Sequence, residues 1–513
     1  SDLSGVVTFT IDASDNNLGE IIPQATATTN SSLMKKIDTI SYNAVLKSST
    51  TNLQVGSHIE GTNANDQFGY SVSISDDGSE IVGGAEEHDN DRGYIMWYRW
   101  DGSSWQKRTQ IYGNDTTDGH FGCDVALSGN GQRLIVGAYN ENDDSGENGK
   151  VYAYIQSGTQ TAAIDGGSQN FGKFVSASYE GTRFVTVDPY VGAYVCDEIT
   201  TYGNWTVTEI ESYNNNANNE NEYGDCAISG DGNTIVFTRP AAQSPAPYGM
   251  GSSGAFRVYT YNGSSWSLKG STMYPNPTTS FGRWGRYKSQ VSLNYDGSRL
   301  AIVSGNTWNI QVYEWDGSDW EILGSGQSSY ILFSSSMLPG ASSSPQEKTV
   351  SLNKEGNLLC IGWPWVTYTD ANGVNTNGGA SYIFQYDPTK TEINYDSEDE
   401  DVGPIGWRIN SLTPNLPPDG YQLYAEANGD WYGMPSVISG DGTTVVSGAR
   451  YFDGTAGSNT GCINVRQTGF PVTGTQTDIF FTLESNALTI ASNNSDITKA
   501  TIGDEVTISY TYD

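Results

Sequence analysis

The residues of this chain best suited to hold a ligand are aromatic side chains in long polar segments. Trp363, Trp365 and Tyr368 lie within GWPWVTYTDANGVNTNGG. Trp308 and Trp431 lie in two other such segments. Exposed aromatic rings form stacking platforms and the energetic centres of interfaces. We therefore expect these five residues to form a binding site for a glycan or a protein. The alternative is that Trp363 and Trp365 only pack their own loop.

Acidic and histidine side chains offer little support for catalysis. The acidic runs at 86–91 and 398–401 could bind Ca²⁺ weakly, although runs of like charge are usually solvated. His58, His88 and His120 occur in separate contexts and are expected to be ordinary loop residues. No nucleophile elbow, zinc-protease, phosphate-loop or dinucleotide motif occurs in the sequence. We therefore expect that the protein is not an enzyme and that it has no catalytic residues, no metal site and no cofactor.

A recurring four-residue signature sets the framework that must position these segments. It consists of Ser or Asn, any residue, Asp, Asn or Glu, and then Gly, followed by a short hydrophobic run. The seven copies are SDDG (75–78), SGNG (128–131), SYEG (178–181), SGDG (229–232), NYDG (294–297), NKEG (353–356) and SGDG (439–442). Their glycines recur at intervals of 50 to 86 residues. Such a repeat of short strands predicts an all-β fold, a seven-bladed β-propeller.

Each repeat reads as four short strands joined by polar turns. In the first, GYSVSIS, EIVGGA, YIMWYRW and WQKRTQIY follow one another. Gly in the signature supplies the positive φ of a tight turn. The copies that contain Glu180 and Glu355 are expected to form looser turns. A second turn, seen in WDGSSW (100–105), YNGSSW (261–266) and WDGSDW (315–320), predicts facing aromatic pairs on the outer strands.

The last blade lacks a fourth strand of its own. Three strands are readable at 434–440, 443–450 and 461–469, and no fourth follows them. Segment 51–61, ahead of the first blade, has the texture of a fourth strand. We predict that Leu53 to Ile59 pairs beside Cys462 to Val465. That pairing would close the ring and remove exposed sheet edges. The propeller would then span residues 51–470.

Connection lengths distinguish the two faces of the predicted ring. Turns between the first and second strands, and between the third and fourth, are tight in nearly every blade. The other connections vary in length, at 138–149, 213–222, 238–254, 324–348, 362–379 and 388–431. Variation confined to one face suits a recognition surface on a rigid scaffold. Drift in solvated loops is the alternative.

An aromatic residue followed by Gly precedes most of the turns, and a V-G-A element follows. The first blade has DQFGYSVSIS with EIVGGA, and the second has HFGCDVALS with LIVGA. This pattern, over roughly residues 51–470, resembles the FG-GAP repeat of integrin-α-type propellers. Many such repeats carry a D-x-N-x-D-G-x-x-D loop that binds Ca²⁺. Here the loop has shrunk to S-x-D-G, so the calcium role is not expected to carry over. The short-turn variant resembles repeats in large surface proteins of marine microbes and viruses.

The two ends of the chain contain further β-segments, at 1–50 and 471–513. Strands are expected at 5–12, 38–46, 477–485 and 505–513. The tail ITKATIGDEVTISYTYD resembles the opening strands of bacterial Ig-like domains. Because a full sandwich of that type needs about 100 residues, either a further domain is cut or both ends form one small β-unit. The start SDLSGVV lacks an initiator Met, which suggests a processed form or a segment of a longer protein.

Composition restricts the partners. With 25 basic and 59 acidic residues the net charge is −34, which disfavours nucleic acid and anionic membranes. The sequence contains no run of 18 apolar residues, so no membrane span is expected. The five scattered cysteines are expected to be small buried apolar residues.

Taken together, these features favour a non-enzymatic recognition or attachment protein, extracellular and displayed on a cell or virion surface. Its partner would be a glycan or protein receptor, bound by the variable loops. The alternative is a structural subunit of a virion, tail fibre or extracellular filament, whose loops contact neighbouring subunits.

Overall fold

The structure is a computed structural model of the chain, and it separates into two compact units, Gln54–Arg466 and Ser1–Leu53 with Gln467–Asp513. It describes residues 3–10, 24–25, 35–37, 40–45, 54–114, 118–143, 146–147, 149–168, 170–200, 203–212, 223–243, 254–274, 286–303, 310–324, 348–369, 375–392, 405–409, 423–424, 429–468, 473–476, 479–484, 487–491 and 505–512.

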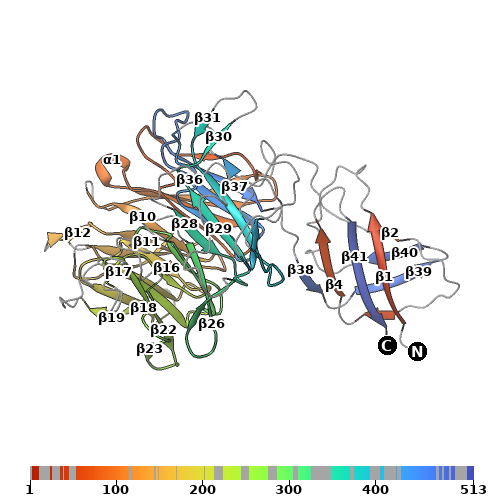
Figure 1. The fold of residues 1–513 in the computed structure, drawn as a ribbon. Helices are drawn as coiled ribbons and strands as arrows, with labels where there is room; N and C mark the ends of the chain where they lie inside the picture. Colours follow the sequence, from red (N-terminus) through yellow and green to blue (C-terminus); the bar gives the residue numbers. More distant parts are fainter. Residues whose placement is uncertain are drawn as a thin grey trace. The chain divides into compact units, whose positions relative to one another are not determined.

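In the described part of the larger unit, seven antiparallel sheets of four or five strands form the blades, with two small hairpins besides, which confirms the predicted seven-bladed β-propeller (Figure 1). In each blade, strands A to D pair in that order, and the A strands line a central cavity. Blades 1 to 3 are β6 (Ser71–Ile74), β7 (Glu80–Ala85), β8 (Tyr94–Trp100) and β9 (Trp105–Tyr112); β10 (Phe121–Leu127), β11 (Arg133–Ala138), β14 (Lys150–Ile155) and β15 (Gln160–Asp165); and β16 (Phe174–Ala177), β17 (Arg183–Asp188), β18 (Gly192–Glu198) and β19 (Trp205–Ser212).

The remaining four blades follow the same order. They are β20 (Cys226–Ile228), β21 (Thr234–Arg239), β22 (Ala255–Tyr261) and β23 (Trp266–Leu268); β24 (Val291–Leu293), β25 (Arg299–Val303), β26 (Ile310–Trp315) and β27 (Trp320–Ile322); β28 (Thr349–Leu352), β29 (Leu358–Trp363), β32 (Ala380–Tyr386) and β33 (Trp407–Ile409); and β35 (Ser436–Ile438), β36 (Thr444–Ala449), β37 (Cys462–Gln467) and β5 (Ile59–Glu60).

The seventh blade is closed by the segment that precedes the first. Strand β5 pairs with β37, with Ile59 opposite Ile463. The Val55 amide also donates to the Val465 carbonyl at 2.8 Å. The predicted closure is therefore confirmed over the described residues of that segment, which begin at 54. Residues from the two ends of the repeat region thus share one sheet.

The S-x-D-G turns all have the same closed backbone. In each, the Gly amide donates to the carbonyl of the first turn residue, at 2.8 to 3.2 Å. This includes Gly181 and Gly356, at 3.0 and 2.9 Å, so the expectation of looser turns beside Glu180 and Glu355 is wrong. In the first turn, Ser75 Oγ donates to Asp77 and accepts from the Glu80 amide. These bonds explain why a Ser or Asn begins the signature.

The seven turns also bond to one another in a complete ring. In each turn, the amide of the second or third residue donates to a carbonyl of the next turn, and the seventh donates back to the first. The bonds are Asp76 to Gly129, Asn130 to Tyr179, Tyr179 to Gly230, Asp231 to Tyr295, Tyr295 to Lys354, Lys354 to Gly440 and Asp441 to Asp76, at 2.7 to 3.0 Å. The repeated signature therefore closes the ring as well as each hairpin.

The aromatic-Gly and V-G-A elements meet at the boundaries between blades. In four blades, a B-strand glycine lies against the backbone of the aromatic-Gly pair that opens the next blade. A Cβ on that glycine would lie 2.0 to 2.3 Å from the facing carbonyl oxygen. The facing pairs are Gly84 with Gly122, Gly137 with Gly172, Gly362 with Gly433 and Gly448 with Gly69. Since real Cβ atoms do not approach so closely, only Gly fits at these positions.

Either a Ser or an Asp side chain links neighbouring A strands by a hydrogen bond. In blades 1, 3, 5 and 6, a Ser two residues before the turn accepts from an amide of the next A strand. The pairs are Ser73 with Leu127, Ser176 with Ile228, Ser292 with Leu352 and Ser351 with Ile438. In blades 2 and 4 that position is Ala126 or Ala227, and an Asp two residues earlier bonds the next strand instead. These residues are Asp124 and Asp225.

The outer strands carry the predicted aromatic pairs. The rings of Trp100 and Trp105 lie 5.2 Å apart, and those of Trp315 and Trp320 lie 5.6 Å apart. In blade 6 the corresponding pair is Tyr386 and Trp407, at 5.4 Å. The 20 residues between them are a long C–D connection. Placing all of 388–431 on the variable face was therefore wrong, because the part before β33 connects the C and D strands.

The terminal unit contains strands from both ends of the chain. One sheet has the order β1 (Leu3–Thr10), β41 (Glu505–Tyr512), β4 (Ile40–Val45) and β38 (Thr473–Gln476). The other is β2 (Gln24–Ala25), β40 (Ala487–Ala491), β39 (Ile479–Glu484) and β3 (Lys35–Ile37). Of the two alternatives for the ends, the structure has the combined β-unit. Figure 1 shows both termini at the paired strands β1 and β41.

The cysteines agree with the sequence-based expectation. Cys123, Cys196, Cys226, Cys360 and Cys462 are buried, and none of them forms a disulfide. Among the described residues, no helix has the length and apolar character needed to cross a membrane.

Candidate functional site

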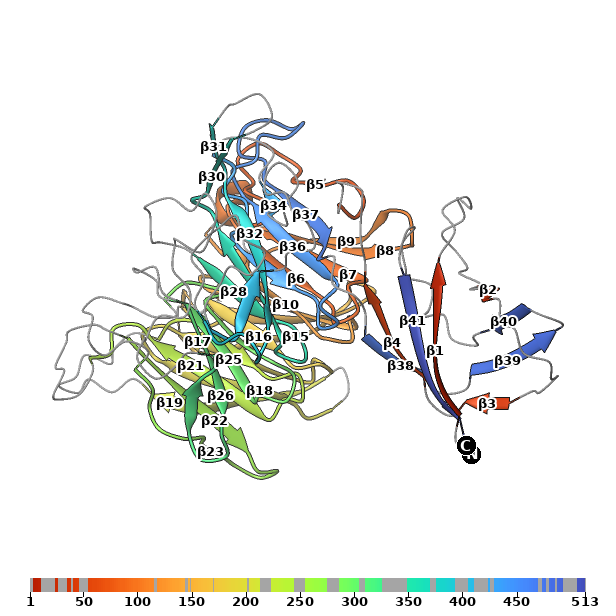
Figure 2. The same ribbon diagram turned by 45° about the vertical axis from the view of Figure 1, so that its right-hand side comes forward.

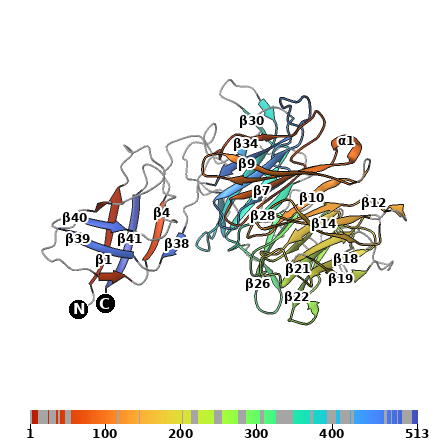
Figure 3. The ribbon, with the colours of Figure 1, turned by 180° about the vertical axis from the view of Figure 1, so that it is seen from behind.

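The B–C and D–A connections emerge on one face of the ring, which we call the loop face. Two of them form small hairpins, β12 (Asn142–Asp143) with β13 (Gly146–Glu147) and β30 (Thr367–Thr369) with β31 (Asn375–Asn377). Figure 2 shows the second hairpin projecting from blade 6. In Figure 3, β12 and the one-turn element α1 (His88–Asp91) project on the same side. All the sites described below lie at this face.

Three aromatic residues from separate connections meet there, and we call them the aromatic cluster. Trp365 follows β29, Trp431 precedes β35 and Tyr451 follows β36. The ring centroids of Trp365 and Trp431 lie 4.8 Å apart, and those of Trp431 and Tyr451 also lie 4.8 Å apart. The guanidinium of Arg450 lies 4.6 Å from the Trp431 ring and 4.9 Å from the Tyr451 ring. All four side chains remain partly exposed.

Trp431 is held in an unusual backbone conformation. Its φ is +57°, in the left-handed region that bulky residues rarely adopt. Such a residue costs roughly 1–2 kcal/mol and persists where its surroundings fix it. Backbone hydrogen bonds on both sides of Trp431 fix this conformation. The Tyr451 amide donates to the Asp430 carbonyl, and the Tyr432 amide donates to the Gly378 carbonyl. The position of the Trp431 ring is therefore set by a rigid backbone.

The structure corrects one predicted binding residue. Trp363 is fully buried at the end of β29, where it packs among Val366, Ala380 and Tyr382. The reason is that β29 runs through Trp363 and is buried along its whole length. For Trp363 the packing alternative therefore holds, and this ring is not an exposed platform.

The other predicted binding residues have different outcomes. Trp365 and Trp431 are brought into contact, as described above. Tyr368 lies on β30 opposite Thr376, and its side chain is outside the described part of the chain. Trp308 and the acidic run 398–401 also lie outside the described residues.

Charged residues converge at the end of the central channel on the loop face. Lys288 of blade 5 donates to the Cys123 carbonyl of blade 2 at 3.1 Å. The same ammonium lies 3.1 Å from the Tyr70 ring centroid of blade 1. Arg450 of blade 7 approaches that ring from 5.3 Å. Side chains of three blades and a backbone carbonyl of a fourth therefore meet at the channel mouth.

Burial perturbs the titration of this group. It lowers the pKa of Lys288 to about 7, although Glu86 and Asp124 oppose the shift. Burial raises the pKa of Asp124 to about 6, and Lys288 opposes that change. It also raises the pKa of Glu86. Beneath lies a cavity of about 160 Å³ lined by A strands.

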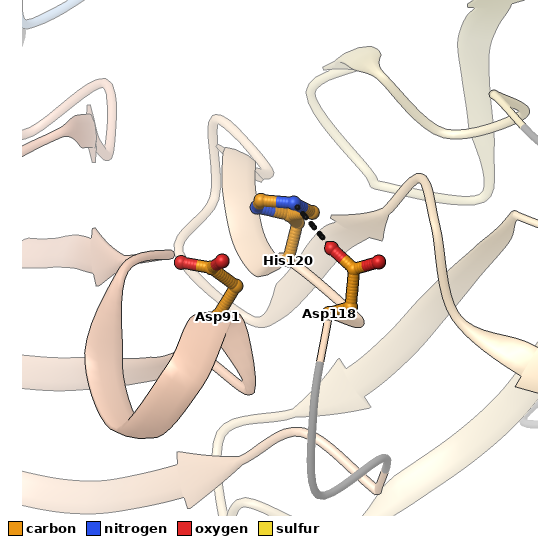
Figure 4. Close-up of side chains that lie close together, drawn as sticks. All are labelled: Asp91, Asp118 and His120. Carbon is orange, nitrogen blue, oxygen red and sulfur yellow. Dashed lines mark ion pairs between the residues drawn. The ribbon is translucent and has the colours of Figure 1, made fainter.

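A third group combines two carboxylates and an imidazole (Figure 4). Asp91 ends α1, while Asp118 and His120 belong to the connection from blade 1 to blade 2. One potential ligand atom from each lies within 4.8 Å of the others. The Asp118 amide donates to the Asn90 carbonyl at 2.9 Å, and the His120 amide donates to the Asp91 carbonyl at 2.7 Å. Backbone hydrogen bonds therefore hold the two segments together.

Sequence reasoning missed several residues of these groups. Tyr451 and Arg450 directly follow the V-G-A element of blade 7, a position that could have marked them as part of the loop face. Lys288 lies 165 residues from the carbonyl it contacts, and no local pattern signals that contact. Asp118 and His120 are likewise far from Asp91 in the chain. The sequence contexts of the three histidines differ, and none of them indicates that His120 lies beside two carboxylates.

Part of the chain matches a known repeat family. Residues 105–154, from β9 through most of β14, match the FG-GAP repeat family. The structure resembles the β-propeller domain of Cps50 (Swd1) from Myceliophteria thermophila, with a TM-score of 0.46 and 8% identity over 80% of this chain and 99% of that one. It also resembles the WD40 repeats of RRP9, with a TM-score of 0.46 and 10% identity over 85% and 100% of the two chains. A search of curated proteins found no match. By its own sheets the chain contains a seven-bladed β-propeller, and residues 105–154 match the FG-GAP repeat.

Proposed function

We propose that this protein is a non-enzymatic recognition or attachment protein, whose loop face binds a glycan or protein receptor outside the cell, on a cell surface or virion. The aromatic cluster is the observation that supports this proposal most strongly. Trp, Tyr and Arg are the residues most enriched at the energetic centres of interfaces. Here one of each type, with a second Trp, gathers from three connections on a rigid ring.

The ring positions suit an edge-lined recess better than one flat platform. The planes of Trp365 and Trp431 meet at 57°, and those of Trp431 and Tyr451 at 89°. A ligand that contacts the cluster would therefore meet ring faces and edges together. The guanidinium of Arg450 adds hydrogen-bond donors, which suit the carbonyl, carboxylate or hydroxyl oxygens of either ligand class.

The titratable groups of the channel favour a structural role over catalysis. Lys288 is engaged by the Cys123 carbonyl and the Tyr70 ring. Asp124 accepts from the Val125 and Val175 amides, so its carboxylate bonds two blades. Perturbed pKa values also arise in structural networks of this kind.

The hydrogen bonds within the S-x-D-G turns favour a structural role for their carboxylates without calcium. Ca²⁺ takes six to eight oxygen ligands. In the first turn, one oxygen of Asp77 already accepts from Ser75, at 2.6 Å, and from the amide and hydroxyl of Ser79, at 3.0 and 2.8 Å. We propose that these carboxylates fasten the hairpins instead of holding Ca²⁺. The terminal unit, with two antiparallel sheets, would be an Ig-like module in addition to the propeller.

Replacing Trp431 with Ala is expected to weaken receptor binding at least about 30-fold, since an interface centre contributes about 2 kcal/mol or more. The fluorescently labelled protein is applied to a glycan array and to host cells treated or untreated with protease. Trp266→Ala serves as the matched control, because Trp266 is also half-buried but lies on the C–D hairpin of blade 4.

Equal binding by wild type and Trp431→Ala would show that the aromatic cluster is not the receptor site. Loss of binding in both variants would point to general instability, which circular dichroism would reveal. If wild type binds neither glycans nor cells and native mass spectrometry instead shows ordered self-assembly, the protein is a structural subunit.

A further inference from the structure

We propose that Asp91, Asp118 and His120 form a binding site for a divalent transition metal of the zinc class. This departs from the sequence-based expectation of no metal site. It rests on the geometry of the three side chains and on a buried carboxylate behind the imidazole. It is independent of the proposed receptor binding by the aromatic cluster.

The spacing of the ligand atoms fits a tetrahedral ion. His120 Nε2 lies 3.3 Å from Asp118 Oδ1. Two ligands, each roughly 2.0–2.1 Å from a tetrahedral Zn²⁺, lie about 3.3 Å apart. Asp91 offers a third ligand atom within 4.8 Å of the other two. If its carboxylate moved to within ligand distance, the three side chains would form a three-ligand site with an open fourth position.

A buried carboxylate lies on the other side of the imidazole, next to its Nδ1 atom. Glu86 Oε2 lies 3.8 Å from His120 Nδ1, and the Glu86 side chain is only 7% exposed. Neither of these two atoms has a hydrogen-bond partner among the described residues. Metal-bound histidines usually donate their other ring N–H to a carboxylate, which fixes the tautomer. Glu86 is placed to do this once Nε2 binds a metal, and the pairing would satisfy both buried atoms.

The remaining contacts hold the ligands in place without a metal. The His120 ring stacks on Tyr139, with centroids 4.6 Å apart and planes 12° apart. The residues Asp91, Asp118 and His120 all have positive φ, between 52° and 63°. Asn140 donates to the Asp118 carbonyl at 2.9 Å, which ties the connection to blade 2. Binding would therefore require little ordering of the chain.

The donor set selects the kind of ion. Ca²⁺ and Mg²⁺ prefer oxygen ligands, and Ca²⁺ needs six to eight of them. An imidazole with two carboxylates suits Zn²⁺ and similar transition metals. Two carboxylates also neutralise the charge of a divalent ion. His88, the nearest other histidine in sequence, is bound to Asp66 at 2.6 Å and would not compete.

The test is zinc binding to the full chain, measured by calorimetry and by competition with a chromophoric chelator. Wild type is expected to bind one equivalent that Ca²⁺ does not displace. Asp118→Asn and His120→Gln are each expected to weaken binding at least about 10-fold, the loss typical of disturbed metal sites. Asp118 is 61% exposed, so its replacement should leave the fold intact.

Two matched controls separate this site from general acidity. Asp89→Asn removes one charge from an exposed left-handed position of the same turn. His58→Gln removes an imidazole that contacts Glu60 in blade 7. Both controls should bind zinc as wild type does. Absence of zinc binding in wild type, or equal affinity in Asp118→Asn and Asp89→Asn, would overturn the proposal.

Discussion

Replacing Gly448 with Ala is expected to lower the free energy of unfolding by about 3 kcal/mol, the upper range for forced overpacking. The added Cβ would lie 2.0 Å from the Gly69 carbonyl oxygen, and Gly69 belongs to the neighbouring first blade. Both partners are backbone, so no rotamer change relieves the contact. The blades would have to separate where β5 and β37 close the ring. Urea denaturation followed by tryptophan fluorescence measures the change.

Gly102→Ala is the control for this prediction. Gly102 has a φ of +97°, whereas Gly448 lies outside the left-handed region. A Cβ at Gly102 meets no atom within 4 Å. Only backbone strain then opposes the control substitution, at about 1 kcal/mol. If Gly448→Ala proves no more destabilising than Gly102→Ala, close contact between the blades does not explain the glycine at position 448.

The sequence predicted the ring well because its signals are local and repeated. Each S-x-D-G turn needs a Gly with positive φ and a side chain that caps the hairpin, so the signature marks every A–B turn. The closing strand was predicted for a similar reason, since a blade with three strands leaves an edge that must be covered. These features depend on residues within a few positions of one another.

The candidate sites could be predicted only in part, because their contacts join distant segments. Trp365 and Trp431 were both selected as exposed aromatics, but nothing in the sequence indicates that they touch. Trp363 was misread because a buried strand and a loop can both contain W-P-W, and the end of β29 is not marked. Trp407 was missed for a related reason, since 20 residues separate it from its partner Tyr386.

The links between A strands show a pattern that the sequence does contain. In blades 2 and 4, Ala126 and Ala227 replace the Ser two residues before the turn, and Asp appears two residues earlier; blade 7 has Val437 and Pro435 at these positions. Either side chain accepts an amide proton from the next blade. Aligning the seven turns would have revealed this exchange. Its physical meaning needed the structure, because the acceptor and the amide belong to different blades.

Asp225→Ala is accordingly expected to destabilise the protein by about 3 to 5 kcal/mol, since each buried donor left unpaired costs about 1–3 kcal/mol. The Asp225 carboxylate accepts from the Gln290 amide at 2.6 Å, the Val291 amide at 2.9 Å and the Cys226 amide at 2.9 Å. Two of these donors belong to blade 5, so the substitution also removes the link between blades 4 and 5. Urea denaturation again gives the loss.

A second substitution tests whether that link is the cause. Ala227 occupies the position where blades 1, 3, 5 and 6 carry the linking Ser, and the Leu293 amide corresponds to the amides those serines bind. Adding Ala227→Ser to Asp225→Ala should recover about 1 kcal/mol, the net value of one hydrogen bond. In wild type the same change should add little, because Asp225 already joins the blades. If Ala227→Ser restores no stability to Asp225→Ala, the Ser and Asp side chains are not equivalent links between blades.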